Sequence, residues 1–271
     1  MPELPEVETT CRGIHPHLVG NTLLSVAVLE SRLRWTVSEE FDHLRDSPVL
    51  DVTRRGKYIL IELPAQRHIL IHLGMSGSLR ICNPEEELRK HDHIIFSLST
   101  GLQMRYHDPR RFGCVLWVEQ AIHQHPLLEK LGPEPLEDCF SIEHFTAATK
   151  GRKTTIKQHI MHSHIVVGVG NIYACEALFI AGIHPKREAG RVSKARLTRL
   201  RSAIRFVLRR SIEQGGTTLK DFRNSDGEPG YFKQQLCVYD RESQPCLKCQ
   251  SIIKRTVLGQ RSTFYCPKCQ K

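Results

Sequence analysis

The sequence of 271 residues lacks a long, uninterrupted hydrophobic segment. Its most apolar run, Ile165 to Ile183, is broken by Asn171, Glu176 and several glycines, so it indicates buried protein rather than a membrane-spanning helix. The N-terminus is acidic and has no apolar core segment, which argues against a signal peptide. We therefore expect a cytoplasmic protein that has no membrane partner.

Acidic residues are also scarce relative to basic ones. The chain has 29 Asp and Glu against 39 Lys and Arg, which gives a formal net charge of +10 and a pI near 9.2. This surplus points to a polyanionic partner, nucleic acid first and an acidic membrane surface second, although a basic surface can also serve solubility alone. The sequence has no internal repeat and no low-complexity segment, and its length and 40% hydrophobic content can supply two domains with cores.

Cysteines are not scarce, but without an export signal we expect them to be reduced rather than paired in disulfides. Four of the ten form two closely spaced pairs, Cys246-x2-Cys249 and Cys266-x2-Cys269, separated by sixteen residues. This spacing can place four thiolates tetrahedrally around one Zn²⁺. Because such a site leaves no position for substrate, the zinc would be structural and would supply the folding energy of a short tail, roughly 10–16 kcal/mol in finger peptides. The other six are interpreted as reduced, mostly buried thiols: Cys11, Cys82, Cys114, Cys139, Cys175 and Cys237.

Hydrophobic periodicity divides the chain into regions of different secondary structure. Val7, Cys11, Ile14 and Leu18 predict one face of a helix that starts after Pro5. Short alternating or apolar runs follow as far as Val118, with no helical pattern between them, which favours a β-sandwich or barrel. The predicted strands include 22–29, 58–63, 68–73, 93–98, 102–106 and 114–118.

Helical patterns return after a proline- and glycine-rich stretch at 127–139, which we interpret as an interdomain linker. The clearest helix follows Ser193, a candidate cap, and ends before Gly215-Gly216. Its apolar face comprises Leu197, Leu200, Ile204, Val207 and Leu208. We predict an α+β protein with a β-sandwich domain (1–130), a linker (131–140), a helical domain (141–236) and a zinc finger (237–271).

The first six residues, Met1-Pro2-Glu3-Leu4-Pro5-Glu6, can carry chemistry. Removal of Met1 would leave a secondary amine at Pro2, and an α-amino group with a pKa of roughly 7.7–8.0 is far less protonated at neutral pH than lysine. Such an amine can form an imine with an electrophilic carbon, and Glu3 beside it can exchange a proton. The alternative is that the prolines only stiffen the start of a helix.

Several loops combine basic, apolar and glycine residues. The sequence HDPRRFG at 107–113 joins two predicted strands, and its arginines and phenylalanine suit phosphate contact and insertion into a base stack. A second loop, 73–77, exposes Met75; either loop alone can also be an ordinary turn. Glycines at 167–170 open a helix and can hold an anion or allow close helix packing, and a predicted hairpin at 259–264 has Arg261 at its turn.

Taken together, these stretches resemble bacterial formamidopyrimidine-DNA glycosylase (the MutM/Fpg family), bifunctional enzymes that remove oxidised purines such as 8-oxoguanine. The resemblance covers the whole chain and rests on PELPEVE, RRGKYILIEL, HLGMSGSLR, HDHIIF, YHDPRRFG, VVGVGNIYACEALF, EQGGTTLKDF, GEPGYF and the four cysteines. It implies an N-terminal β-sandwich, a C-terminal helix-two-turn-helix domain with a zinc finger, and double-stranded DNA bound between them.

The resemblance also implies roles for single residues. Pro2 matches the nucleophile, Glu3 the acid that assists opening of the sugar ring, and Lys57 and Arg261 phosphate-binding residues that also serve elimination. Met75, Arg110 and Phe112 match the residues that fill the gap left by the flipped base, and 217–231 the loop that covers the lesion. The DNA-contacting positions are matched by His91, Arg110, Arg111, Arg152, Lys153 and Asn171.

Two other functions are compatible with these motifs. One is the related branch of glycosylases that acts on oxidised pyrimidines, although Leu4, Met75 and the 110–112 run favour the purine branch. The other is a non-catalytic zinc-finger DNA-binding protein, which would not require Pro2, Glu3 and Lys57. Cys175, His159 and His162-Ser163 depart from the family pattern. We expect a monomer that acts on DNA with oxidised bases or abasic sites and is associated with the nucleoid.

Overall fold

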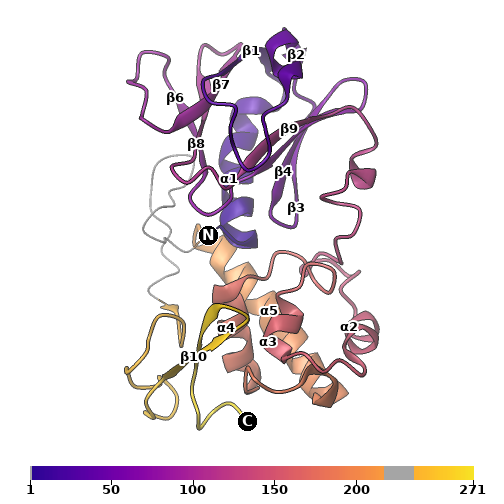
Figure 1. Ribbon diagram of the computed structural model, residues 1–271, viewed down its shortest axis with the longest axis vertical. Coiled ribbons are helices and arrows are strands. Elements are labelled where there is room, and N and C mark those ends of the chain that lie inside the picture. The colour runs from indigo at the N-terminus through magenta and orange to yellow at the C-terminus, as the bar shows by residue number, and fades with distance from the viewer. Residues whose placement is uncertain (1, 217–234) are drawn as a thin grey trace. The chain divides into compact units, whose positions relative to one another are not determined.

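A computed structural model describes residues 2–216 and 235–271, and the predicted lesion-covering loop lies outside these residues. The described residues form two compact units (Figure 1). Unit 1 contains the residues up to Lys130 together with 214–216, and unit 2 contains 131–213 and 235–271. The finer boundaries at 140 and 236 stay predictions.

Unit 1 begins with helix α1 (Leu4–Leu18), which confirms the helix predicted after the N-terminal motif. Glu3 is its N-cap residue, and the Glu6 carboxylate accepts a hydrogen bond of 2.8 Å from the Glu3 N–H, which satisfies one of the unpaired donors of the first turn. The predicted apolar stripe of α1 is buried, with Val7 and Ile14 at most 1% exposed.

The rest of unit 1 is a sandwich of two antiparallel sheets, as predicted. The five-stranded sheet has the order β2-β1-β7-β8-β6 and the four-stranded sheet the order β3-β4-β5-β9. The strands are β1 (Thr22–Val28), β2 (Ser47–Pro48), β3 (Asp51–Arg55), β4 (Tyr58–Leu63), β5 (Arg67–His72), β6 (Ser78–Cys82), β7 (Asp92–Leu98), β8 (Gln103–His107) and β9 (Cys114–Val118), with the short 3-10 helices η1 (Glu39–His43) and η2 (Ile122–Gln124). Alternate apolar residues of both sheets and the α1 stripe share one core, which includes Ile59 and Ile61 of β4 and Ile94 and Phe96 of β7.

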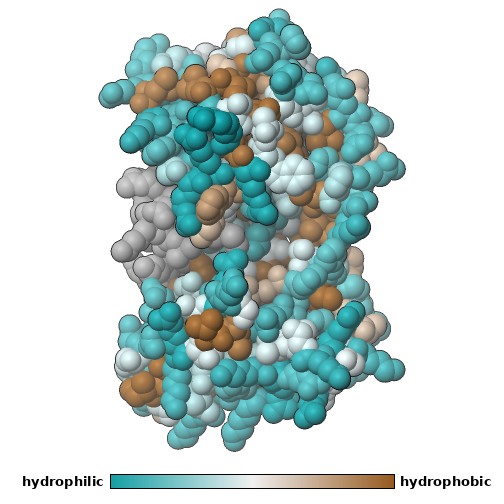
Figure 2. Space-filling view, in the orientation of Figure 1, coloured by the Kyte–Doolittle hydropathy of each residue, from teal (hydrophilic) through white to brown (hydrophobic). Residues whose placement is uncertain are grey.

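Unit 2 is helical and ends in a two-stranded hairpin. Its elements are α2 (Ile142–Thr149), α3 (Ile156–Ile160), α4 (Asn171–Ala181), η3 (Ala189–Arg191), α5 (Lys194–Glu213), β10 (Lys254–Leu258) and β11 (Arg261–Tyr265). The predicted apolar face of α5 is buried, and α5 packs against α4, which is buried on nearly all sides. No helix among the described residues is long and apolar enough to cross a membrane. Hydrophilic residues cover most of the face shown in Figure 2, between smaller hydrophobic patches.

Candidate nucleic-acid interface

The N-terminal end of α1 is joined to the hairpin that carries Lys57. Pro2 and Glu3 are buried immediately before the helix, and Lys57 lies in the two-residue turn between β3 and β4. Arg54 connects the two parts: its Nε donates to Glu8 of α1 at 2.8 Å and its Nη1 donates to the Gly56 carbonyl at 3.0 Å. Burial raises the pKa of Glu8, but hydrogen bonds and charge from Arg54 and a neighbouring arginine outweigh it and lower the pKa. Glu8 and Arg54 are therefore a charged pair.

The loop at 107–113 is organised by the carboxylate of Asp108, which is fully buried. Its Oδ1 accepts hydrogen bonds from the Ser76 hydroxyl at 2.9 Å and the Arg110 N–H at 3.3 Å. Its Oδ2 accepts from the Gly113 N–H at 2.9 Å and the Tyr106 hydroxyl at 3.3 Å. Because Ser76 belongs to the loop at 73–77, this one carboxylate holds the two loops together.

The two loops also touch through their backbones, and they expose the three residues that the resemblance groups. A Cβ on Gly74, which has φ +62°, would lie 2.5 Å from the Gly113 nitrogen, so only glycine permits this contact. The Phe112 side chain is 44% exposed, and the Arg110 guanidinium lies 4.8 Å from the centre of its ring. Met75 is half-buried in the neighbouring loop. The three residues therefore lie on two adjoining loops, and their role at the DNA stays a prediction.

Arg111 differs from its neighbour. Its Nη1 lies 3.0 Å from Oε2 of Glu30, so its charge is already paired within unit 1. It has φ +56°, a left-handed conformation that turns the chain back toward β9. The geometry favours Arg110 over Arg111 as an available cation.

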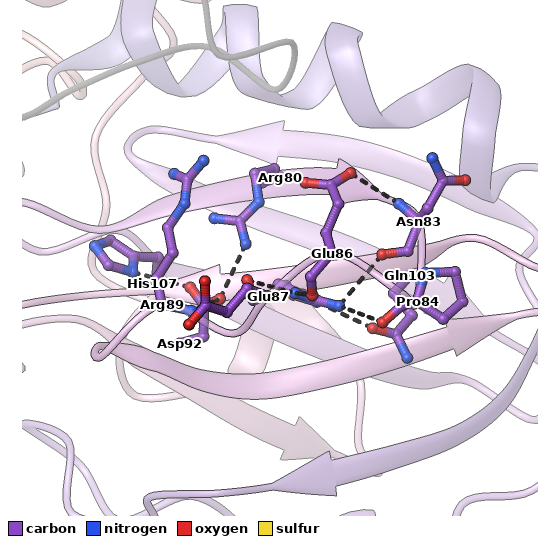
Figure 3. A network of polar contacts seen from close by, with 10 residues as sticks. Arg80, Asn83, Pro84, Glu86, Glu87, Arg89, Asp92, Gln103 and His107 are labelled. Carbon is purple, nitrogen blue, oxygen red and sulfur yellow. Dashed lines mark hydrogen bonds and ion pairs between the residues drawn. The ribbon is translucent and has the colours of Figure 1, made fainter.

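His91 lies at the start of β7 beside a buried polar network, part of which is shown in Figure 3. Its ring centre is 6.0 Å from that of His107, whose Nδ1 donates to Asp92 at 2.9 Å. Arg80 donates to the same carboxylate at 2.9 Å. Burial raises the pKa of Asp92, but hydrogen bonds from His107, the Arg89 N–H and Arg80 bring it down to about 2. Desolvation lowers the pKa of His91, and the neighbouring His107 adds to the effect, so a phosphate partner would be needed to favour the charged ring.

In unit 2, Asn171 lies beside the hairpin that carries Arg261. Asn171 is the first residue of α4, after the glycine run, and its side-chain N–H donates to the Ser262 carbonyl at 3.0 Å. Lys157 of α3, 1% exposed, donates from Nζ to Asn171 Oδ1 at 2.5 Å and to Thr263 Oγ1 at 2.6 Å. Arg261 itself is exposed and is the first residue of β11, directly after the turn at 259–260 rather than at the turn as predicted. The buried lysine thus fixes the hairpin against the N-terminus of α4.

Arg152 and Lys153 lie on an exposed turn between α2 and α3. The Arg152 Nε donates to the Ala148 carbonyl at 3.3 Å, and its backbone carbonyl accepts from the Gly190 N–H at 2.8 Å. Both residues are exposed, in the same unit as Asn171 but on a separate segment.

The four clustered cysteines fit one structural zinc. Their sulfur atoms all lie within 4.8 Å of one another, and the Cys249–Cys266 and Cys246–Cys269 sulfur pairs are 3.5 and 3.9 Å apart. Zn–S bonds of about 2.3 Å in a tetrahedron place sulfurs about 3.8 Å apart. All four positions are filled by thiolate, so a metal here has no open coordination site.

The finger is also fastened to α4 by Glu176, a residue that the sequence motifs did not single out. Its carboxylate, 2% exposed, accepts three backbone N–H bonds of 2.8–2.9 Å from Cys237, Val238 and Tyr239. Burial raises the pKa of Glu176, and these donors partly offset that effect. Asp108, Lys157 and Glu176 share two features: each is a buried charged residue, and each has partners far away in sequence.

Comparison with known proteins agrees with this arrangement. The "Formamidopyrimidine-DNA glycosylase N-terminal domain" model matches residues 1–115, the "Formamidopyrimidine-DNA glycosylase H2TH domain" model residues 131–223, and the "Zinc finger found in FPG and IleRS" model residues 243–271. The third match supports the assignment of one structural zinc to the four-cysteine cluster.

Full-length relatives carry the same name. The formamidopyrimidine-DNA glycosylase of Alcanivorax borkumensis is 56% identical over 271 residues and covers all of both chains. The MutM (Fpg) structure from Thermus thermophilus is 37% identical with a TM-score of 0.90, covering 99% of this chain and 98% of that one. A Lactococcus lactis Fpg variant bound to Fapy-dG-containing DNA is 28% identical with a TM-score of 0.92 and covers both chains fully. This chain belongs to the formamidopyrimidine-DNA glycosylase family.

Proposed function

We propose that this protein is a bifunctional DNA glycosylase and apurinic/apyrimidinic lyase that excises oxidised purines in base excision repair. The observation that carries the proposal is the link through Arg54, which joins the helix that follows Pro2 and Glu3 to the hairpin of Lys57. A protein that only bound DNA would need no N-terminal amine near a carboxylic acid and a lysine. Its relatives bear the glycosylase name over their full length.

The chemistry that we propose starts with the Pro2 amine once Met1 is removed. The nitrogen lone pair attacks C1′ of the damaged nucleotide, the bond to the base breaks, and the base leaves with a proton. Glu3 protonates the ring oxygen as the sugar opens, which gives a Schiff base between Pro2 and C1′. Loss of a proton from C2′ then expels the 3′ phosphate, and a second elimination expels the 5′ phosphate, with Lys57 and Arg261 binding the phosphates.

The proposed DNA contacts fall into two kinds. Met75, Arg110 and Phe112 fill the space that the extruded base leaves in the stack, since wedge side chains recover part of the cost of unstacking. Backbone contacts come from His91 and Arg110 in unit 1 and from Arg152, Lys153 and Asn171 in unit 2. Arg111 is the weaker candidate for such a contact, because its charge is already paired with Glu30. We assign the catalytic domain to 1–130, the helix-two-turn-helix domain to 141–236 and the finger to 237–271, and we place the enzyme at the bacterial nucleoid through its DNA binding.

Borohydride trapping on an 8-oxoguanine duplex tests the proposal. We expect a covalent complex whose peptide map puts DNA on Pro2, and a Lys57→Ala variant should still be trapped there. An adduct on a lysine, or full activity with Met1 retained, would contradict the proposed nucleophile. Preference for a thymine-glycol duplex would indicate the pyrimidine branch, and DNA binding without trapping or incision would indicate a non-catalytic protein.

A further inference from the structure

Arg105 lies in the middle of β8 and is 1% exposed, yet its hydrogen-bond partners are all neutral oxygens. Its Nε donates to the Gln103 side chain at 3.0 Å. Its two terminal nitrogens donate to backbone carbonyls of one loop, at 2.9 Å to Glu86, 3.1 Å to Pro84, 3.3 Å to Asn83 and 3.4 Å to Glu87. Figure 3 shows the acceptor residues close together, with Asn83, Pro84, Glu86, Glu87 and Gln103 labelled. A planar fork with five donors is the group that can satisfy so many carbonyls at once.

These carbonyls belong to the connection from β6 to β7, residues 83–91, which we call the strap. Residues 83–90 are all exposed, so the strap has no apolar core of its own to order it. Arg105 holds its first half. Asp92 holds its second half, because Oδ2 of Asp92 accepts from the Arg89 N–H at 3.0 Å and the Asp92 N–H donates to the Arg89 carbonyl at 2.9 Å.

The strap ends at His91, and the carbonyl of this last residue is hydrogen-bonded to the loop at 107–113. The Asp108 N–H donates to the His91 carbonyl at 3.0 Å, and the His93 Nε2–H donates to the Asp108 carbonyl at 2.8 Å. The position of the His91 side chain thus depends on where the strap lies between its two anchors.

We propose that Arg105 is a positioning residue that holds the strap so that His91 contacts DNA. The inference rests on the proposed function, in which His91 contacts the phosphate backbone. Arg105 itself is buried and touches no substrate. Its cross-strand partner Arg80 on β6 is held by Asp92, so the two buried arginines anchor opposite ends of the same segment.

The test separates positioning from simple stability. Arg105→Lys keeps the charge and most of the volume but loses the fork, so it should weaken binding to a duplex with a reduced abasic site about tenfold, the loss of one charge-assisted hydrogen bond. The single-turnover rate at saturating DNA should change much less. The matched control is Arg67→Lys, because Arg67 also donates to a turn carbonyl, Pro64 at 2.9 Å, but in the other sheet. It should bind like wild type.

A double-mutant cycle with His91→Ala tests whether Arg105 affects DNA binding through His91. If Arg105 acts through His91, the double variant should bind no more weakly than His91→Ala alone. Additive losses would overturn the inference, as would Arg105→Lys binding like Arg67→Lys. Should Arg105→Lys fold poorly, Gln103→Ala removes one partner of the guanidinium more gently, and amide exchange should then rise in 83–91 while β7 stays protected. Wild-type protein that fails to incise an 8-oxoguanine duplex would instead refute the proposed function.

Discussion

The two regions that we propose to contact DNA are held in place by different chemistry. In unit 1 the loop of Arg110 and Phe112 depends on the buried carboxylate of Asp108 and rests on a large apolar core. In unit 2 the hairpin of Arg261 belongs to a small cluster that includes Cys246 and Cys266. A small core cannot offset the entropy of ordering a chain, so a metal takes its place. The first region should therefore be sensitive to single hydrogen bonds and the second to zinc.

Zinc removal should produce the largest difference between the two regions. Cys249→Ser should lose the metal and unfold the finger, because the metal supplies roughly 10–16 kcal/mol in comparable peptides. Affinity for DNA should fall with it, while unit 1 keeps its fold. Both tryptophans of the chain, Trp35 and Trp117, lie in unit 1, so their fluorescence reports on that unit alone.

The measurement is zinc content together with denaturant unfolding followed by tryptophan fluorescence and by proteolysis of the tail. An unchanged fluorescence transition with a protease-sensitive tail is expected. A variant that lost zinc yet kept full affinity and incision would show that the finger is not part of the DNA site.

Removal of the Asp108 charge should have the next largest effect, confined to unit 1. Asp108→Asn keeps the size but replaces an acceptor oxygen with a donor facing N–H groups, which should cost about 3 kcal/mol of unfolding free energy. Excision of 8-oxoguanine should fall with the loss of order at 107–113. Ser76→Ala, which deletes one of the four bonds, should cost only about 1 kcal/mol.

Fluorescence-detected urea unfolding measures both free energies, and zinc content serves as the control. Loss of zinc in Asp108→Asn would contradict the independence of the two regions. Equal costs for the two variants would mean that Asp108 is not the organising group.

The comparison also explains what the sequence could and could not predict. The helices α1 and α5 were predictable because each needs only its own apolar stripe, and the exposed motif residues were predictable because their chemistry is local. Strands β2, β3 and β6 were not among the predicted strands. Strand β2 has only two residues, and β3 and β6 each carry an arginine whose carboxylate partner comes from another element, Glu8 for Arg54 and Asp92 for Arg80. Periodicity cannot show such pairs.

The same limit applies to the supports of the site. Asp108 lies 32 residues from Ser76, Lys157 lies 106 from Thr263, and Glu176 lies 62 from Val238. These residues touch no substrate in the proposed mechanism, so a motif that encodes chemistry does not identify them. They could be identified only from the structure, in which the fold brings their partners close to them.

Acid should destabilise both units, through a different histidine in each. Burial lowers the pKa of His72 in unit 1 to about 4, with Lys57 adding to the effect, and burial likewise lowers the pKa of His159 in unit 2 to about 4. His72 Nδ1 accepts from the Gly74 N–H at 3.0 Å and so is unprotonated. Below pH 6.5 the unfolded chain binds protons that the folded chain does not, so stability falls as pH drops from about 6.5 to 4 and then levels off, by at most roughly 3 kcal/mol for each histidine.

His159→Gln should flatten this pH dependence in unit 2, measured by amide exchange of α3 and α4. The fluorescence transition of unit 1 should keep its pH dependence, because His72 is unchanged. His72→Gln should give the opposite pattern. If His159→Gln changed the fluorescence transition, the two units would not unfold independently.

The smallest predicted effect compares the two regions as binders of phosphate. Four or five neutralised phosphates predict a slope of about −4 for log affinity against log salt concentration, from roughly −0.9 per phosphate. Arg261→Ala should reduce the slope by about one, because its exposed guanidinium adds one phosphate contact. Arg255→Ala is the matched control, since Arg255 lies on the same hairpin but is already paired, 3.6 Å from Glu242 and 3.1 Å from Ser262. Fluorescence anisotropy at several salt concentrations measures each slope.

Arg110→Ala should also lower the slope by about one, and the double variant with Arg261→Ala by about two, because the two arginines belong to separately stabilised units. An unchanged slope for Arg261→Ala would remove it from the phosphate contacts, and a double variant no different from either single one would mean that the two regions bind DNA only as a single unit.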